Sequence, residues 1–332
     1  MAASPRIQVL PQNLINQIAA GEVVASMASV VKELVENSLD AGATRIEVAL
    51  ENQLRDVVIA DDGIGMGRED AELSLQRHAT SKIRSPEDLF NIATRGFRGE
   101  AVPSIASVSR LELQTRPREA LAGTRIVVDG GRIERIEAVG CPPGTRFAVR
   151  DLFHNTPARL KFLKSPVAEM NAVLRVVVRQ ALASPAVGFV VRRDGEVVLE
   201  LVAGESLEER FRSLMGSRVE EGLLPASHER AASDGHLIRV QGLVARPGSS
   251  LADRRGEFLF VNSRPFTSKS IQAAIEQAAR GFVMVGRFPV FCLFIEVAPG
   301  DVDVNVHPAK EEVRFRDERA VAGACHRAVR EA

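Results

Sequence analysis

The stretch VVKELVENSLDAG at residues 30–42 constrains the fold most, because its pattern predicts a helix with two unlike faces. At about 100° per residue, Glu33, Asn37 and Asp40 fall within about 60° of one another. The opposite side carries the residues expected to be buried, namely Val31, Leu34, Val35 and Ser38. A solvated surface helix is the ordinary explanation of this pattern. Because Asn37 is a poor helix former in mid-helix and a glycine-rich turn follows, the polar face is also a candidate site.

The length of 332 residues allows two hydrophobic cores, and we expect a boundary near residues 202–206, where Gly-Glu-Ser precedes a helix. Residues 1–205 predict an α+β unit with one mixed, largely antiparallel sheet covered by helices on one face. The remaining residues, 206–332, alternate strands and helices and predict a smaller α/β or α+β unit.

Composition narrows the class of protein further. Lys plus Arg and Asp plus Glu both number 43, so the formal net charge is zero, and a mild basic excess in the middle of the chain does not require a polyanionic partner. Three widely separated cysteines argue against a disulfide framework and for a reducing compartment. No histidine lies at metal-ligand spacing, and no signal sequence or membrane-spanning run is found, so we expect a cytoplasmic protein without a zinc site.

A glycine turn follows two predicted strands, residues 44–50 and 55–61. The order Asp61-Asp62-Gly63-Ile64-Gly65 leaves a carboxylate at the end of a strand, where it could accept a hydrogen bond from an exocyclic amine. The glycines let the backbone turn sharply and approach a flat ligand. An ordinary Asp-Gly turn is the more common explanation when the motif stands alone.

Residues 68–100 contain two further motifs, RHATSK at 77–82 and GFRGE at 96–100, the second directly before a predicted helix. Glycine amides and a helix start suit phosphate, and Lys82, Arg95 and Arg98 add positive charge. A surface loop is the alternative. The dipeptide Gly-Lys is absent, which excludes a Walker-type P-loop, and no GxGxxG occurs. In the second part of the chain, VNVHPAK at 304–310 places Lys310 in a loop between strands, where a solvated lysine is the default expectation.

Taken together, these motifs carry a resemblance that none carries alone. In order they are IAAGEVV (18–24), SVVKELVENSLDAG (29–42), DDGIGM (61–66), HATSK (78–82), GFRGEA (96–101), DLFHNTPAR (151–159) and VDVNVHPAK (302–310). They are spread over nearly the whole chain and resemble the MutL family of mismatch-repair proteins. That family shares an ATPase superfamily with type II topoisomerase ATPase subunits, histidine kinases and one class of heat-shock chaperones.

The resemblance implies roles for individual residues. Glu33 resembles the general base that activates water, Asn37 the residue that holds Mg²⁺, and Asp61 the aspartate that accepts from adenine, with Gly65 and Thr145 beside the base. The phosphates would be held by Thr80, Lys82, Gly96, Phe97, Arg98, Gly99, Glu100 and Ala101. Lys310 resembles a lysine that reaches the γ-phosphate from the second, transducer domain, and Arg264 in FVNSRPF resembles a DNA-binding arginine.

The resemblance also implies an activity and partners. We expect a Mg²⁺-dependent ATPase in which ATP orders a lid at about residues 68–100 and the arm before Pro11, and two chains form a clamp around DNA. Expected partners are DNA, through its backbone phosphates, and mismatch-recognition and downstream repair proteins, with nucleoid association during repair. No DQHAxxER string occurs, so we expect a fragment without endonuclease activity. Asp62 and Ser26-Met27 depart from the Asn and Arg-Pro that many members carry.

Two alternatives remain from sequence. One is a non-hydrolysing scaffold that has the same fold and binds DNA or repair proteins. The other is a topoisomerase subunit or chaperone of the same superfamily. The scaffold is disfavoured by the presence of Glu33, Asn37, Asp61 and Lys310. A topoisomerase subunit or chaperone is disfavoured by the motifs NTPAR and HPAK.

Overall fold

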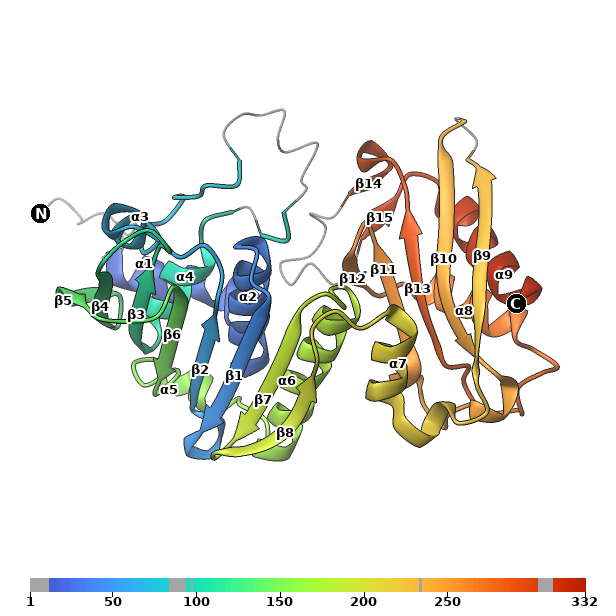
Figure 1. The fold of residues 1–332 in the computed structure, drawn as a ribbon, viewed down its shortest axis with the longest axis horizontal. Helices are drawn as coiled ribbons and strands as arrows, with labels where there is room; N and C mark the ends of the chain where they lie inside the picture. Colours follow the sequence, from blue (N-terminus) through green and yellow to red (C-terminus); the bar gives the residue numbers. More distant parts are fainter. Residues whose placement is uncertain (1–11, 84–93, 97, 233–234, 304–312) are drawn as a thin grey trace, which may run out of the picture. The chain divides into compact units, whose positions relative to one another are not determined.

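A computed structural model describes residues 12–83, 94–96, 98–232, 235–303 and 313–332. The chain divides into two compact units (Figure 1). The first comprises residues 1–82, 96–176 and 189–200, and the second residues 83–95, 177–188 and 201–332. The predicted domain limits, 1–205 and 206–332, stay a prediction.

Within the described residues, the first unit is built on an eight-stranded sheet with the strand order β5-β4-β3-β6-β2-β1-β7-β8. The pairings recorded from β1 to β6 are all antiparallel. The strands are β1 (Arg45–Glu51), β2 (Asp56–Asp61), β3 (Arg110–Arg116), β4 (Gly123–Asp129), β5 (Arg132–Val139), β6 (Gly144–Arg150), β7 (Gly188–Arg193) and β8 (Glu196–Leu201). Alternate residues of β1 are buried, namely Ile46, Val48 and Leu50, as expected for a sheet covered on one face.

Helices cover the buried face of this sheet. Helix α2 (Met27–Asp40) packs on β1 and β2, α4 (Ala101–Ser107) packs on β3 and β4, and α1 (Gln12–Val23) packs on α4. The other helices are α3 (Arg68–Leu73), α5 (Pro157–Leu160) and α6 (Pro166–Leu182), with a 3₁₀ turn at Asn52–Leu54. The predicted α+β class is confirmed. None of the helices in the described part of the chain has the length and apolar composition needed to cross a bilayer.

The second unit contains a five-stranded sheet with the order β12-β11-β13-β10-β9. Its strands are β9 (Leu223–Ala231), β10 (Leu237–Ala245), β11 (Glu257–Val261), β12 (Arg264–Phe266) and β13 (Phe291–Glu296). Strands β11 and β13 pair in parallel, which requires the crossover that α8 (Lys269–Ala278) provides. Helix α9 (Glu318–Glu331) packs on α8, β9 and β10, and the core between them is apolar. Two short strands, β14 (Val302–Asp303) and β15 (Arg314–Phe315), pair with each other, and β15 contacts α9.

A buried arginine organises the start of the second unit. Arg210, on α7 (Leu207–Met215), is 0% exposed and forms an ion pair with Glu205. Its guanidinium also donates to four backbone carbonyls, those of Ala181 (3.3 Å), Pro185 (3.0 Å), Val187 (3.0 Å) and Val202 (2.5 Å). A buried charge is tolerated when it is paired and its donors are satisfied, and both conditions hold here. Arg210 therefore joins the end of α6, the start of β7 and the end of β8 to α7.

Candidate functional site

Helix α2 provides the first wall of the candidate site. Ser26 caps its N-terminus, because the Ser26 hydroxyl accepts from the Ser29 amide and the Ser29 hydroxyl accepts from the Ser26 amide at 2.8 Å. The helix therefore has a well-defined start although Arg-Pro is replaced by Ser26-Met27. The four residues predicted to face inward are buried: Val31, Leu34, Val35 and Ser38.

The side-chain ammonium of Lys82 lies against the polar face of α2. Lys82 Nζ donates to Asn37 Oδ1 at 2.8 Å and to Asp40 Oδ2 at 2.5 Å. The amide of Gly96 donates to the same Asp40 oxygen at 3.2 Å. The side chains of Lys82 and Asp40 are only 18% and 8% exposed, so the pair is largely removed from water. The structure thus joins the 30–42 helix to both the 77–82 and the 96–100 motif.

Glu33 lies one helical turn before Asn37 on the same face. Its carboxylate oxygen Oε1 is 3.5 Å from Lys32 Nζ, and the same lysine is 3.7 Å from Glu36 Oε1. Lys32 and Glu36 are not among the residues predicted for the site, although their spacing of four residues is a recognised signal for an ion pair on a helix. Lys32 orients the Glu33 carboxylate beside the cluster.

Asp61 ends β2 and is fixed from two sides. The Ser38 hydroxyl on α2 donates to Asp61 Oδ2 at 2.7 Å, and the Gly63 amide donates to Oδ1 at 3.0 Å. Burial raises the pKa of Asp61 above its ordinary value, and these hydrogen bonds partly offset the rise. The predicted strand-end carboxylate and the predicted helix are therefore in direct contact.

The turn after Asp61 is packed closely against neighbouring backbone. Gly65 has a φ of +68°, and a Cβ there would lie 2.2 Å from the carbonyl oxygen of Arg116. Only glycine fits such a position. The Met66 amide donates to the Thr115 hydroxyl at 2.9 Å, and that hydroxyl lies 3.0 Å from the hydroxyl of Thr145. Thr145 is paired with Asp61 between β6 and β2, so the predicted base-binding residues lie on adjacent backbone.

The carboxylate of Asp62 contacts the start of β1, whereas that of Asp61 contacts α2. Its carboxylate accepts from the amides of Thr44 and Arg45 at 2.7 and 2.8 Å and from the Thr44 hydroxyl at 2.5 Å. Partial burial would raise the pKa of Asp62, but these hydrogen bonds outweigh it and hold the pKa below its ordinary value. Asp62 therefore anchors the start of β1, and its departure from the family's asparagine leaves Asp61 in place.

The motifs at 77–82 and 96–101 lie side by side. The His78 amide donates to the Gly99 carbonyl at 3.1 Å, and a Cβ on Gly99, whose φ is +62°, would lie 2.4 Å from the Ala79 carbonyl oxygen. The Thr80 hydroxyl accepts from the Lys82 amide at 3.2 Å, and Glu100 Oε1 is 3.5 Å from the His78 ring. Arg98 is exposed, and Ala101 begins α4.

Three predicted residues cannot be assigned to this cluster. Phe97 and Lys310 lie outside the described residues. Arg264 belongs to the second unit, where it begins β12 and donates through Nη2 to the carbonyl of Thr94. The expected contact of Lys310 with the γ-phosphate stays a prediction.

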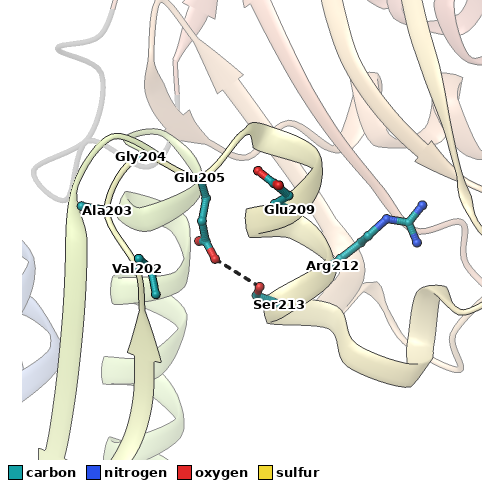
Figure 2. A pocket seen from close by; sticks show the side chains of 7 residues that line it. All are labelled: Val202, Ala203, Gly204, Glu205, Glu209, Arg212 and Ser213. Atoms are coloured by element: carbon teal, nitrogen blue, oxygen red, sulfur yellow. Dashed lines mark hydrogen bonds between the residues drawn. The ribbon is translucent and has the colours of Figure 1, made fainter.

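A surface hollow in the second unit was not predicted from sequence (Figure 2). It is lined by Val202, Ala203, Gly204, Glu205, Glu209, Arg212 and Ser213, and the Ser213 hydroxyl donates to Glu205 Oε1 at 3.4 Å. Figure 2 shows the Arg212 side chain pointing away from Glu205. Across the described part of the chain, no cluster of three or more His, Cys, Asp or Glu side chains could hold a metal ion.

Two family models match this chain. One, described as "Histidine kinase-, DNA gyrase B-, and HSP90-like ATPase", matches residues 25–130 and therefore includes the α2 face and the Asp61 turn. The other, described as "DNA mismatch repair protein, C-terminal domain", matches residues 211–332. The first range contains the motifs from residue 29 to residue 101, and the second contains VDVNVHPAK at 302–310.

Known relatives agree with both models. The DNA mismatch repair protein MutL of Geobacter sulfurreducens is 50% identical over 98% of this chain and 53% of its own length. Among solved structures, the N-terminal domain of a DNA repair protein matches with 25% identity, a TM-score of 0.83 and coverage of 96% of this chain and 97% of that one. The Aquifex aeolicus MutL ATPase domain complexed with ADP matches with 28% identity, a TM-score of 0.60 and coverage of 91% and 98%.

The chain spans about half the length of the curated relatives it matches. Over that span, the two family models, the relatives and the solved structures point to the same family. The chain belongs to the MutL family of DNA mismatch repair proteins and has the fold of a MutL ATPase domain.

Proposed function

We propose that this chain binds ATP with Mg²⁺ in its first unit and hydrolyses it slowly to ADP and phosphate. The observation that carries the proposal is the convergence of α2, the Asp61 turn and the two motifs around residues 77–101. Asn37, Asp40, Lys82 and Gly96 are joined by hydrogen bonds, and Asp61 is joined to the same helix through Ser38. A MutL ATPase domain of related fold has been solved with ADP, which supports a nucleotide as the ligand.

The adenine end of the site is assigned to Asp61. The Ser38 and Gly63 donors fix the orientation of its carboxylate, so little reorganisation is needed when an exocyclic amine approaches. Gly65 and Thr145 lie beside it and would contact the base. Because Gly65 has no Cβ, the turn can pack against the Arg116 backbone and keep this position beside Asp61.

The phosphate end of the site fits Mg²⁺ by the chemistry of its donors. Asn37 Oδ1 and Asp40 Oδ2 already hold a cation, the ammonium of Lys82, at 2.8 and 2.5 Å. Oxygen ligands of this kind are those that Mg²⁺ takes in proteins. Asn37 would hold the ion, which when bound neutralises phosphate charge. Lys82, Thr80 and residues 96–101 would hold the phosphates.

Hydrolysis needs a group that orients water. Glu33 lies on the same face as Asn37, one turn earlier, and its carboxylate oxygen Oε1 is 3.5 Å from Lys32 Nζ. Glu33 would act as the general base, and Lys310 from the second domain would stabilise the charge that develops on the γ-phosphate.

In the cell, ATP would act as a conformational switch that couples mismatch recognition to downstream repair. Nucleotide would order a lid at about residues 68–100 and the N-terminal arm, and two chains would dimerise as a clamp around DNA. Arg264 would contact the DNA backbone, and the protein would work in the cytoplasm at the nucleoid. Here residues 1–205 form the ATP-binding domain and residues 206–332 the transducer domain.

Steady-state ATPase and nucleotide-binding assays with Glu33→Ala and Asn37→Ala test the proposal. Glu33→Ala is expected to keep MgATP binding and lose at least about 99% of turnover, since it removes the base alone. Asn37→Ala is expected to lose MgATP binding as well. The matched control is Glu196→Ala, an exposed glutamate of β8, which should retain full turnover. Undiminished hydrolysis in both site variants would refute the assignment. Binding of DNA without any turnover in the unaltered chain would favour the scaffold instead.

A further inference from the structure

The segment 151–159, DLFHNTPAR, caps the C-terminal end of α4. The Phe153 amide donates to the Val108 carbonyl at 2.7 Å, and Asn155 Nδ2 donates to the Ser107 carbonyl at 2.9 Å. The last carbonyls of a helix have no partner within the helix and must find one outside it. Phe153 is 0% exposed, so the cap is also anchored in the core.

The other end of the same segment contacts α1. Arg159 Nη2 donates to the Ile18 carbonyl at 3.4 Å. At Gly21, one turn further along α1, an added Cβ would lie 1.9 Å from Nη2 and 2.7 Å from Cζ of Arg159. The guanidinium therefore occupies the space that a side chain at position 21 would need. Glycine in a helix interior costs roughly 1 kcal/mol relative to alanine, and this contact gives a reason for it.

Through these contacts, residues 151–159 touch both α4 and α1. Helix α1 packs directly on α4, and α4 begins at Ala101, immediately after the Gly96–Glu100 stretch proposed to hold phosphate. The segment thus holds α4 at its end and α1 at its flank. Arg159 therefore adds one side-chain contact to the direct packing of α1 on α4.

We infer that Arg159 is a positioning residue of the proposed ATPase, acting through its contact with Gly21 to hold α1 on α4 and keep residues 96–101 in place for the nucleotide. The inference rests on the proposed function. The contacts described for Arg159 are with α1, at Ile18 and beside Gly21, so its effect on nucleotide would travel through α1 and α4. Loss of the contact should weaken the binding of MgATP more than it slows the turnover of bound nucleotide.

Four variants test the contact: Gly21→Ala, Arg159→Ala, Arg159→Lys and the double variant Gly21→Ala/Arg159→Ala. Gly21→Ala and Arg159→Ala should each raise KM for MgATP about tenfold and change kcat less than about threefold. The double variant should be no worse than Arg159→Ala alone, because the methyl group then fills vacated space and alanine favours the helix. Arg159→Lys should rescue part of the loss. Arg175→Ala, an exposed arginine of α6, is the matched control and should change neither parameter.

Hydrogen exchange without nucleotide provides an independent measure of the same contact. The amides of α1 should exchange at least about tenfold faster in the two single variants and should regain protection in the double variant relative to Gly21→Ala. Additive effects of the two substitutions, or a fall in kcat at constant KM, would overturn the inference. Normal ATPase kinetics with unchanged exchange in Arg159→Ala would overturn it while the proposed function stands. Absence of ATP binding in the unaltered chain would instead refute the proposed function, and the exchange pattern would still show whether the contact holds α1.

Discussion

The hydroxyl of Ser38 donates a 2.7 Å hydrogen bond to Oδ2 of Asp61, and this single contact joins the buried side of α2 to the end of β2. Ser38 is 3% exposed, so the bond is shielded from water and holds the carboxylate in one orientation. The helix that carries Glu33 and Asn37 is therefore joined directly to the strand end that carries Asp61.

Substitution of Asp61 by asparagine should change which base the site prefers. The amide keeps the size of the side chain but replaces one acceptor oxygen with a donor nitrogen, which cannot accept from the amine of adenine. We expect ATP affinity to fall about 10- to 100-fold, as for loss of a hydrogen bond to a charged group, with a smaller effect on GTP. Isothermal titration with both nucleotides measures this. Asp194→Asn, in an exposed turn where φ is 49°, is the matched control because asparagine tolerates that conformation. Equal losses for ATP and GTP would contradict base recognition by Asp61.

Substitution of Lys82 by alanine should destabilise the first unit. It removes the ammonium that Asn37 and Asp40 share, and in the intact site the Asp40 side chain is only 8% exposed. We expect a loss of about 1–3 kcal/mol in the free energy of unfolding, measured by urea denaturation. Lys164→Ala, which removes an exposed lysine, should stay within about 0.5 kcal/mol of the unaltered chain.

A double variant tests why Lys82→Ala should lower the stability of the first unit. Asp40→Asn in the Lys82→Ala background should restore part of the lost stability, since it removes the carboxylate charge that the Lys82 ammonium compensates. If the two substitutions destabilise additively, the ammonium does not compensate the Asp40 charge.

The stability of the second unit should depend on pH through Glu257. Burial and the nearby charge of Glu276 raise the pKa of Glu257 from 4.5 to about 8, while Gln272 and Arg254 act in the opposite direction. Gln272 Nε2 donates to Glu257 Oε2 at 2.7 Å, and Arg254 Nε is 3.9 Å from the same oxygen and 2.7 Å from Glu276 Oε1. Between these two pKa values the folded chain retains a proton that the unfolded chain has lost.

Stability should therefore fall as pH rises from about 4.5 to about 8, with a contribution from this group of at most about 1.4 kcal/mol per pH unit. Glu257→Gln should remove that contribution, so the variant should gain stability relative to the unaltered chain at pH 8 and not at pH 5. Urea denaturation across this range measures the difference, and Glu220→Gln, at an exposed position, is the control. A parallel pH dependence in Glu257→Gln and the unaltered chain would show that the carboxyl is ionised in both states.

Periodicity and turn residues were sufficient to predict the local elements of the site. The helix expected at 30–42 is α2 at Met27–Asp40, and the strands expected at 44–50 and 55–61 are β1 at Arg45–Glu51 and β2 at Asp56–Asp61. These elements are encoded by residues close in sequence, since apolar spacing and glycine placement act over a few positions.

The contacts that assemble the site join residues that are far apart in sequence. The helical pattern predicts that Ser38 is buried, but nothing in its spacing indicates that it bonds Asp61, 23 residues later. Lys82 and Asp40 are 42 residues apart, and Arg159 and Ile18 are 141 apart. Side-chain partners at such separations are decided by tertiary packing, which a single sequence does not encode in any local pattern. The same holds for the parallel pairing of β11 with β13.

The bonds of Arg210 to four main-chain carbonyls also bear on how this region can change through evolution. Every amino acid supplies a carbonyl, so positions 181, 185, 187 and 202 can drift in side-chain identity without breaking any of those bonds. Comparison of covarying positions across relatives would therefore give little sign of the contact. Exchange of the arginine itself would remove all of its bonds at once, so a substitution scan of this region should find one intolerant position surrounded by permissive ones.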